Sequence, residues 1–314
     1  MRHIQRENQS QVTEFIILGF SDYPDLQLLL FMSFLFIYLV TLMGNIAILS
    51  LMCIDSRLHK PMYFFLCNLG ILDLCLTSCT IPKMLSIFLM DNKAISFLGC
   101  MIQLYLLMTF TGVELYLLTA MSYDRFVAIC NPLRYSVIMN KKVCVLLSAS
   151  SWLAGFLDIV PHCVSLSYSS YCGHNVIDHL FCDFQTVVKL ACSDISDIKQ
   201  LMNTLNTSLI LTCVLLIFTS YVRIISAILK IQSVEGRHKA FSTCSSHLTV
   251  ICIYSAAVFF VYMRPLSETT SPGDKLFDAL YSTLIPMLNP IIYSLRNKDV
   301  KAAVKKGLQG RTGG

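Results

Sequence analysis

The sequence predicts an all-α membrane protein, a seven-transmembrane helix bundle, on the strength of its composition and its hydropathy. Of the 314 residues, 55% are hydrophobic and only 14% are charged, whereas soluble domains carry roughly 25% charged residues. The mean hydropathy of +0.64 is typical of a chain whose solvent is largely lipid. The net charge of +5 is scattered between apolar blocks and forms no basic domain, so we expect no nucleic acid partner.

Seven apolar segments are long enough to cross a bilayer as helices, which takes about 20 residues each. The seventh is the most polar, because it contains Asp278, Pro286 and Pro290. The predicted spans are 26–53, 61–81, 97–123, 143–164, 201–222, 241–263 and 276–295. They divide the chain into an N-terminal tail (1–25), a transmembrane domain (26–295) with one long connection at about 165–200, and a C-terminal segment (296–314).

The C-terminal segment predicts a short amphipathic helix. Val300, Val304 and Leu308 recur every four residues, and the neighbouring lysines lie largely off that stripe. Such a helix would lie on the anionic inner leaflet, and the competing interpretation is a frayed basic tail.

The distribution of lysine and arginine predicts the orientation. Sixteen of the 24 basic residues flank the side of the membrane that carries the C-terminus, and cytoplasmic loops carry the excess of positive charge. We therefore expect a multi-pass plasma membrane protein with an extracellular N-terminus, where Asn8 in Asn-Gln-Ser is a glycosylation candidate. The first 24 residues are too polar for a signal peptide, so the first span is expected to direct insertion.

Two acids, Asp73 and Glu114, lie near mid-membrane in the second and third spans. Charge at that depth is costly, so both are functional candidates. They could share a proton, a sodium ion or ordered waters, or each could be a neutral acid that hydrogen-bonds locally. Asp124 and Arg125 lie at the inner edge of the third span, where a simple interfacial anchor would also account for them.

Four long motifs, read in order, resemble the vertebrate odorant receptors, which are rhodopsin-like G-protein-coupled receptors. They are LHKPMYFFLCNLGILD from Leu58, MSYDRFVAICNPLRY from Met121, KAFSTCSSHLTV from Lys239 and PMLNPIIYSLRN from Pro286. The resemblance starts at VTEFIILGF and covers nearly the whole chain. It implies a receptor, not an enzyme, without a cofactor. Such a receptor binds a small volatile odorant and activates a heterotrimeric G protein of the olfactory stimulatory class, which raises cyclic AMP.

The resemblance also implies roles for particular residues. Gly44-Asn45 matches the first-helix motif, and Arg125 resembles the arginine that engages the G protein. The implied coupling and activation residues are Asp124, Arg125, Tyr221, His247, Asn289, Pro290 and Tyr293. Two positions depart from the family pattern. Phe126 replaces a usual tyrosine, and Tyr254-Ser255-Ala256 stands where Phe-Tyr-Gly is frequent, so an aromatic residue at the pocket floor is displaced or lost.

Cysteines at the outer side predict disulfides, because that side is oxidising. Cys100, Cys172, Cys182 and Cys192 allow three connectivities, and the residues alone do not choose between them. The resemblance implies a bridge between Cys100 and Cys182 and a second between Cys172 and Cys192.

A ligand pocket is expected in the outer half of the bundle, largely apolar with a few polar groups. The competing interpretation of each candidate is helix packing or lipid contact. The candidates are Leu107, Met108, Thr111, Gly112, Leu205, Asn206, Leu209, Val258, Phe259, Tyr262, Ala279 and Thr283. Amine receptors have an acid where Leu107 stands, and opsins have a lysine near Thr283. The expected ligand is therefore a mostly apolar molecule with a hydroxyl or carbonyl group.

The sequence leaves three alternative functions. A receptor of the same fold could sense metabolites outside the nose, and the motifs do not separate it from an odorant receptor. A transporter or channel could use Asp73 and Glu114 as an ion path, but the sequence shows none of the internal repeats that many transporters have. An intramembrane enzyme ranks lowest, because the sequence contains no His-Glu-x-x-His motif.

Overall fold

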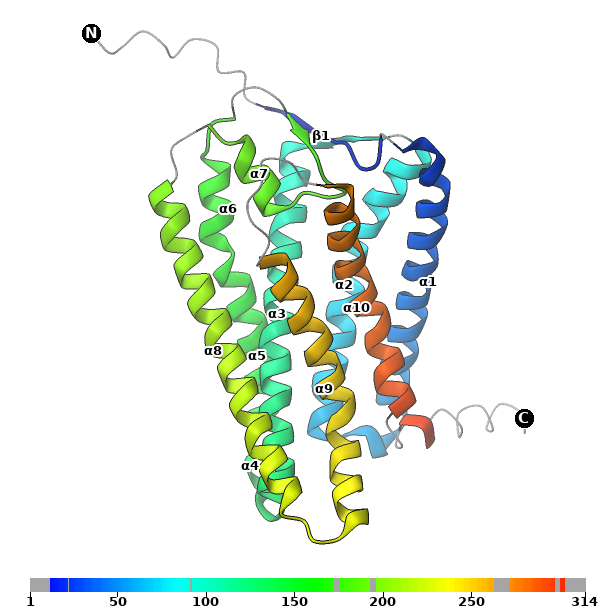
Figure 1. The fold of residues 1–314 in the computed structure, drawn as a ribbon, viewed down its shortest axis with the longest axis vertical. Helices are drawn as coiled ribbons and strands as arrows, with labels where there is room; N and C mark the ends of the chain where they lie inside the picture. Colours follow the sequence, from blue (N-terminus) through cyan, green and yellow to red (C-terminus); the bar gives the residue numbers. More distant parts are fainter. Residues whose placement is uncertain are drawn as a thin grey trace.

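The computed structural model describes residues 12–21, 23–90, 92–171, 175–192, 196–262, 271–296 and 300–302. Within these ranges, long helices run side by side as one bundle (Figure 1). They are α1 (Pro24–Ile54), α2 (Pro61–Met90), α3 (Phe97–Cys130), α5 (Lys141–Asp158), α6 (Val160–Ser167), α8 (Ser196–Leu229), α9 (Val234–Tyr262) and α10 (Pro272–Arg296). Short turns of helix, η1 (Ser56–Leu58), η2 (Pro132–Arg134) and α4 (Tyr135–Ile138), lie in the connections.

Five of these helical elements are long and apolar enough to cross a membrane. They are α1, α2, α3, the joined α5 and α6, and the Thr204–Leu229 part of α8. The apolar part of α9 is shorter, Cys244–Ala257. Large apolar side chains face outward, as in Leu28 with 68% and Phe36 with 65% of the side chain exposed. Such exposure would be unfavourable in water, and it fits a lipid environment.

The helices extend beyond the ends of the predicted spans. Hydropathy indicates only the apolar segment that faces lipid, whereas the backbone hydrogen bonds of a helix continue beyond that segment. The second span was predicted to end at Ile81, but α2 continues to Met90 with Pro82 inside it. The fourth predicted span is interrupted at Ile159, between α5 and α6. Pro161 follows at once, and it has no N–H group to continue the hydrogen bonding of α5.

A three-stranded sheet caps one end of the bundle, which corrects the purely α-helical prediction. Its strand order is β2-β1-β3, with β1 (Glu14–Ile17) antiparallel to β2 (Ala94–Ser96) and parallel to β3 (Val176–Ile177). Phe15 is fully buried and packs on the rings of Phe97 and Tyr171 at 5.8 and 5.6 Å. The strands are too short for a recognisable pattern, and they pair across long stretches of chain, so only the tertiary structure reveals them.

The connection between α6 and α8 is also structured. It holds β3 and the helix α7 (Phe184–Leu190), whose N-terminus is capped by the side chain of Asp183. Figure 1 shows both at the same end as β1. We call this end the disulfide end, because the bonded Cys100 and Cys182 lie there, and we call the opposite end the Arg125 end. Asn8 and most of the predicted amphipathic helix lie outside the described residues, although residues 300–302 are helical.

Candidate functional site

The centre of the bundle contains a hydrogen-bonded cluster that joins α1, α2 and α10. The side-chain amide of Asn289 donates to both carboxylate oxygens of Asp73, at 3.2 and 3.1 Å. Asp73 is fully buried and Asn289 nearly so. A small cavity adjoins the pair, lined by Asn45, Ile48, Leu66, Leu69, Gly70, Asp73, Asn289, Pro290 and Tyr293.

Asn45 and Gly44 of α1 lie against the turn of α10 that contains Pro290, and each complements the proline in a different way. A proline has no N–H group, so the carbonyl of Pro286, four residues earlier, lacks its helical donor. The amide of Asn45 donates to that carbonyl at 3.2 Å and to the carbonyl of Thr41 at 3.0 Å. A Cβ atom on Gly44 would lie 3.0 Å from Cγ of Pro290, so a larger residue would push the proline ring away from α1.

Glu114 of α3 is buried, and its Oε1 atom has no hydrogen-bond partner among the described residues. The described residues contain no group of three or more histidine, cysteine or acidic side chains that could hold a metal ion. A sodium ion between Asp73 and Glu114 would therefore need hydroxyl, carbonyl or water ligands as well. The shared ion, shared proton and neutral acid remain predictions.

Near the Arg125 end, Arg125 pairs with its neighbour Asp124. Nε of Arg125 donates to Oδ2 of Asp124 at 2.9 Å, and Nη2 donates to the same oxygen. Both residues are buried, so the pair is part of the bundle interior. The hydroxyl of Tyr135 in α4 donates to Oδ1 of Asp124 at 2.7 Å. Sequence reasoning gave Tyr135 no role, because nothing in the motif shows that this loop residue folds back onto α3.

A second buried pair links α8 and α9 at the same end. The hydroxyl of Tyr221 lies 2.8 Å from Nδ1 of His247, and His247 is fully buried. Tyr293 of α10 is buried in the same hydrophobic cluster as Tyr221, and its hydroxyl has no hydrogen-bond partner among the described residues. The seven predicted switch residues are thus interior groups of α3, α8, α9 and α10.

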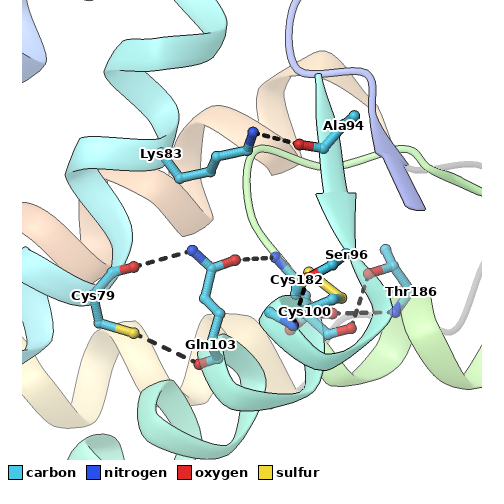
Figure 2. The surroundings of a disulfide bond; sticks show 10 residues. Cys79, Lys83, Ala94, Ser96, Cys100, Gln103, Cys182 and Thr186 are labelled. Atoms are coloured by element: carbon cyan, nitrogen blue, oxygen red, sulfur yellow. Dashed lines mark hydrogen bonds between the residues drawn. A yellow bond between two sulfur atoms is a disulfide. The ribbon is translucent and has the colours of Figure 1, made fainter. Parts of the chain in front are cut away.

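The predicted bridge between Cys100 and Cys182 is present, with a Cα–Cα distance of 5.5 Å. Figure 2 shows Gln103 beside this disulfide, with its side chain between Cys79 of α2 and Cys182 of the α6–α8 connection. Its amide nitrogen donates to the carbonyl of Cys79 at 3.0 Å, and its Oε1 accepts from the backbone N–H of Cys182 at 2.9 Å. Gln103 therefore adds a second link between α3 and the loop, one that sequence reasoning missed. Cys192 is disulfide-bonded, while Cys172 lies outside the described residues.

The predicted pocket residues of α3 lie where the hydrophobic clusters of the core meet. Leu107 packs against the main cluster and also against the cluster that contains Ala279 of α10. Met108 packs against the cluster around the disulfide. The hydroxyl of Thr111 donates to the carbonyl of Leu107 at 2.9 Å. Thr283 is fully buried and donates to the carbonyl of Ala279 at 2.7 Å.

Asn206 of α8 has an unexpected partner in His162 of α6. The amide nitrogen of Asn206 lies 3.0 Å from Nε2 of His162. His162 is buried, and its ring meets that of Phe184 edge-on at 5.5 Å. In the sequence His162 is a lone histidine inside the fourth span, and its partner Asn206 lies 44 residues away, so the pattern does not indicate its role.

Three predicted pocket residues face away from this region. Gly112 packs on α5, where a Cβ atom would lie 3.9 Å from Cα of Gly155. Leu205 and Leu209 are 56% and 39% exposed on the outside of α8. These placements favour packing and lipid contact, the competing interpretation. The side chains of Val258, Phe259 and Tyr262 lie outside the described residues.

The fold defines a helical-bundle protein with membrane-length helices, and comparison with known proteins identifies its family. A family model described as olfactory receptor matches residues 34–311. Human olfactory receptor 13D1 is 47% identical over 308 residues, which cover 98% of this chain and 89% of that protein. Mouse olfactory receptor 5AR1 is 48% identical, with 96% and 98% covered, and human olfactory receptor 5L1 is 49% identical, with 96% and 97% covered.

The chain therefore belongs to the olfactory receptor family, whose members are multi-pass plasma membrane G-protein-coupled receptors and not enzymes. This confirms the family assigned from the four motifs.

Proposed function

We propose that this chain binds a small, mostly apolar odorant with a hydroxyl or carbonyl group between its helices. Binding activates a heterotrimeric G protein of the olfactory stimulatory class and raises cyclic AMP. The observation that carries the ligand part is the contact between buried His162 and partly buried Asn206, with the ring of Phe184 against that of His162, in the half of the bundle nearest the disulfide end. A ligand site of this composition would orient the ligand through few polar groups and hold it through apolar contact.

We further propose that seven helices cross the membrane and that the disulfide end is extracellular. α9 and α10 have the length for this, and both pack within the bundle. The hydropathy of α10 is lowered by residues that face inward, among them Ser282, Thr283 and Asn289, so its polarity is no obstacle to spanning. The disulfide also favours the oxidising side of the membrane. Enzymatic removal of a glycan from Asn8 on intact cells would test the orientation.

The coupling part of the proposal rests on Arg125. Its guanidinium is held by Asp124 of the same helix, with Tyr135 on the other carboxylate oxygen. We interpret this closed arrangement as the resting receptor. Activation would release Arg125 toward the G protein, and an odorant would favour that state by binding to it more tightly.

The test is to express the receptor with an olfactory stimulatory G protein and record cyclic AMP against an odorant panel. Arg125→Ala should abolish the response while surface labelling stays unchanged. Because this variant leaves the buried Asp124 without its cation, Arg125→Lys serves as a second variant that keeps the charge. An undiminished response in both variants, at equal surface level, would exclude the coupling role.

The ligand contact has its own test. His162→Ala and Asn206→Ala should each weaken potency about tenfold for odorants with a hydroxyl or carbonyl group, since each removes a buried or partly buried polar group that could hydrogen-bond the ligand. Leu209→Ala is the matched control, because Leu209 lies on the same helix as Asn206 and faces outward. Unchanged potency in both pocket variants would remove the pair from the site. Expression of the transcript outside olfactory tissue would favour the alternative, a metabolite receptor of the same fold.

A further inference from the structure

The α9 helix makes a hydrogen bond to α3 that the sequence motif did not predict. The hydroxyl of Tyr254 donates to the backbone carbonyl of Thr111 at 3.0 Å. Tyr254 is only 3% exposed, whereas the next two residues, Ser255 and Ala256, are exposed on the other side of the helix. Adjacent residues of a helix point about 100° apart, so only one of them faces the interior.

The buried position of Tyr254 gives a structural role to the segment Tyr254-Ser255-Ala256, which differs from the frequent Phe-Tyr-Gly pattern of the family. The family often has phenylalanine where Tyr254 stands and tyrosine where Ser255 stands. Here the hydroxyl-bearing aromatic ring stands at position 254, which is buried in this chain, and not at position 255, which is exposed. A phenylalanine at position 254 could fill the same space but could not donate to Thr111. The link between α9 and α3 is therefore a consequence of this chain's own sequence.

Tyr254 shares its face of α9 with His247, which lies seven residues, or about two turns, earlier. His247 is bonded to Tyr221 of α8. Cys244, nearly one turn further toward the Arg125 end, is a free cysteine that is 3% exposed. The inward face of α9 is thus attached to α3 near the predicted pocket and to α8 near the Arg125 end.

We propose that Tyr254 is a positioning residue that holds α9 against α3 in the resting receptor. We also propose that an odorant with an acceptor oxygen releases α9 by taking over the Tyr254 hydroxyl. This inference rests on the proposed function, because Thr111 belongs to the predicted pocket. The hydroxyl of Thr111 already donates within its own helix, so the bond at this point depends on Tyr254. Carbonyl compounds, esters and ethers carry such an oxygen, and hydrocarbons do not.

The first test needs no G protein. Full-length receptor in lipid nanodiscs is treated with N-ethylmaleimide, and modification of each cysteine is followed by peptide mass spectrometry. Tyr254→Phe should speed modification of Cys244 about fivefold, because one lost hydrogen bond shifts the open population by about that factor. Cys144 on α5, which is 4% exposed, is the internal control and should react at its original rate.

Two outcomes of this experiment would overturn the proposal. In one, Cys244 reacts equally fast in Tyr254→Phe and in the native sequence. In the other, Cys244 and Cys144 speed up together, which would mean that the variant loosens the whole bundle.

The second test measures signalling. Tyr254→Phe should raise cyclic AMP without odorant about fivefold at equal surface level and should reduce the advantage of carbonyl odorants over hydrocarbons. Ser255→Ala is the matched control and should behave like the native receptor, since Ser255 is exposed. Equal effects of both variants, or none from Tyr254→Phe in a receptor that responds to odorants, would overturn the role of Tyr254. A Cys244 difference in a chain that never signals would overturn the proposed function and leave the α9 restraint standing.

Discussion

The side-chain amide of Asn289 contacts both carboxylate oxygens of Asp73, which lies 216 positions earlier in the chain. The contact ties α10 to α2 beside the break in hydrogen bonding at Pro290. Asn45 completes the junction from α1 by donating to the carbonyl that Pro290 leaves without a donor. The side chains of Asp73, Asn289 and Asn45 therefore join three helices at the point where α10 lacks a backbone hydrogen bond.

We expect Asn289→Ala to lower the free energy of unfolding by about 1–3 kcal/mol, the usual cost of leaving a buried polar group without its partner. Thermal melting of the detergent-purified receptor measures this. Ser50→Ala on α1 is the control, because Ser50 is exposed and bonds only within its own helix. If Asn289→Ala and Ser50→Ala melt at the same temperature, the junction contributes nothing to stability.

Sodium should raise the melting temperature relative to choline at equal ionic strength. The reason is that an ion between Asp73 and Glu114 would bind the folded bundle and not the unfolded chain. Glu114→Gln and Asp73→Asn should abolish the difference. Asp158→Asn is the control acid, since Asp158 pairs with Tyr116 away from this site. No sodium effect in the native receptor would favour two neutral acids or a shared proton.

Removal of the bridge between Cys100 and Cys182 should prevent surface expression. The two cysteines are 82 residues apart, and closing a loop of that length in the unfolded chain accounts for about 4–5 kcal/mol of stability. Flow cytometry of Cys100→Ser and Cys182→Ser cells measures this. Cys163→Ser, which removes a free cysteine, should reach the surface. Normal surface levels in either bridge variant would contradict the expectation.

The bond from Tyr135 to Asp124 should persist through neutral and mildly alkaline pH. Burial raises the pKa of the Tyr135 hydroxyl, and the nearby negative charge of Asp124 raises it further. A raised pKa means that the folded state keeps the proton longer than the unfolded state does. The stabilisation is therefore complete below about pH 10, the ordinary tyrosine value, and falls as the pH rises above it.

The measurement is the melting temperature of the native receptor minus that of Tyr135→Phe at a series of pH values. This difference in melting temperature should stay constant from pH 7 to 9 and shrink above about pH 10. The corresponding loss in the free energy of unfolding at neutral pH should be about 1.5–3 kcal/mol, the value of a hydrogen bond to a charged acceptor. Tyr168→Phe, an exposed tyrosine, should show no difference at neutral pH. A native-minus-variant difference that is zero throughout would show that Tyr135 does not support Asp124.

The sequence identified some residues of the candidate site and missed others. The acids of the second and third spans and the Asp124–Arg125 pair were named from local sequence, because each lies in a motif or interrupts an apolar run. The Cys100–Cys182 bridge was implied only by the family resemblance, since the residues alone allow three connectivities. Gln103, Tyr135 and His162 were missed, because their roles depend on partners in other elements: Cys79 and Cys182 for Gln103, Asp124 for Tyr135, and Asn206 for His162. Leu205 and Leu209 are exposed on the outside of α8, and the sequence did not indicate this, because that helix is apolar all round and carries little signal of which face is inside.

The sequence by itself determined that this chain is a bundle of membrane-length helices and that it belongs to the olfactory receptor family. Both properties are local, since twenty apolar residues predict a span wherever they lie and a motif is read along the chain. Only the tertiary structure decided which polar groups meet. Asn45 reaches the carbonyl freed by Pro290, and the hydroxyl of Tyr254 reaches Thr111, because helix rotation and packing bring them together. In an apolar interior a polar group without a partner costs free energy, and the fold determines which partners come within reach.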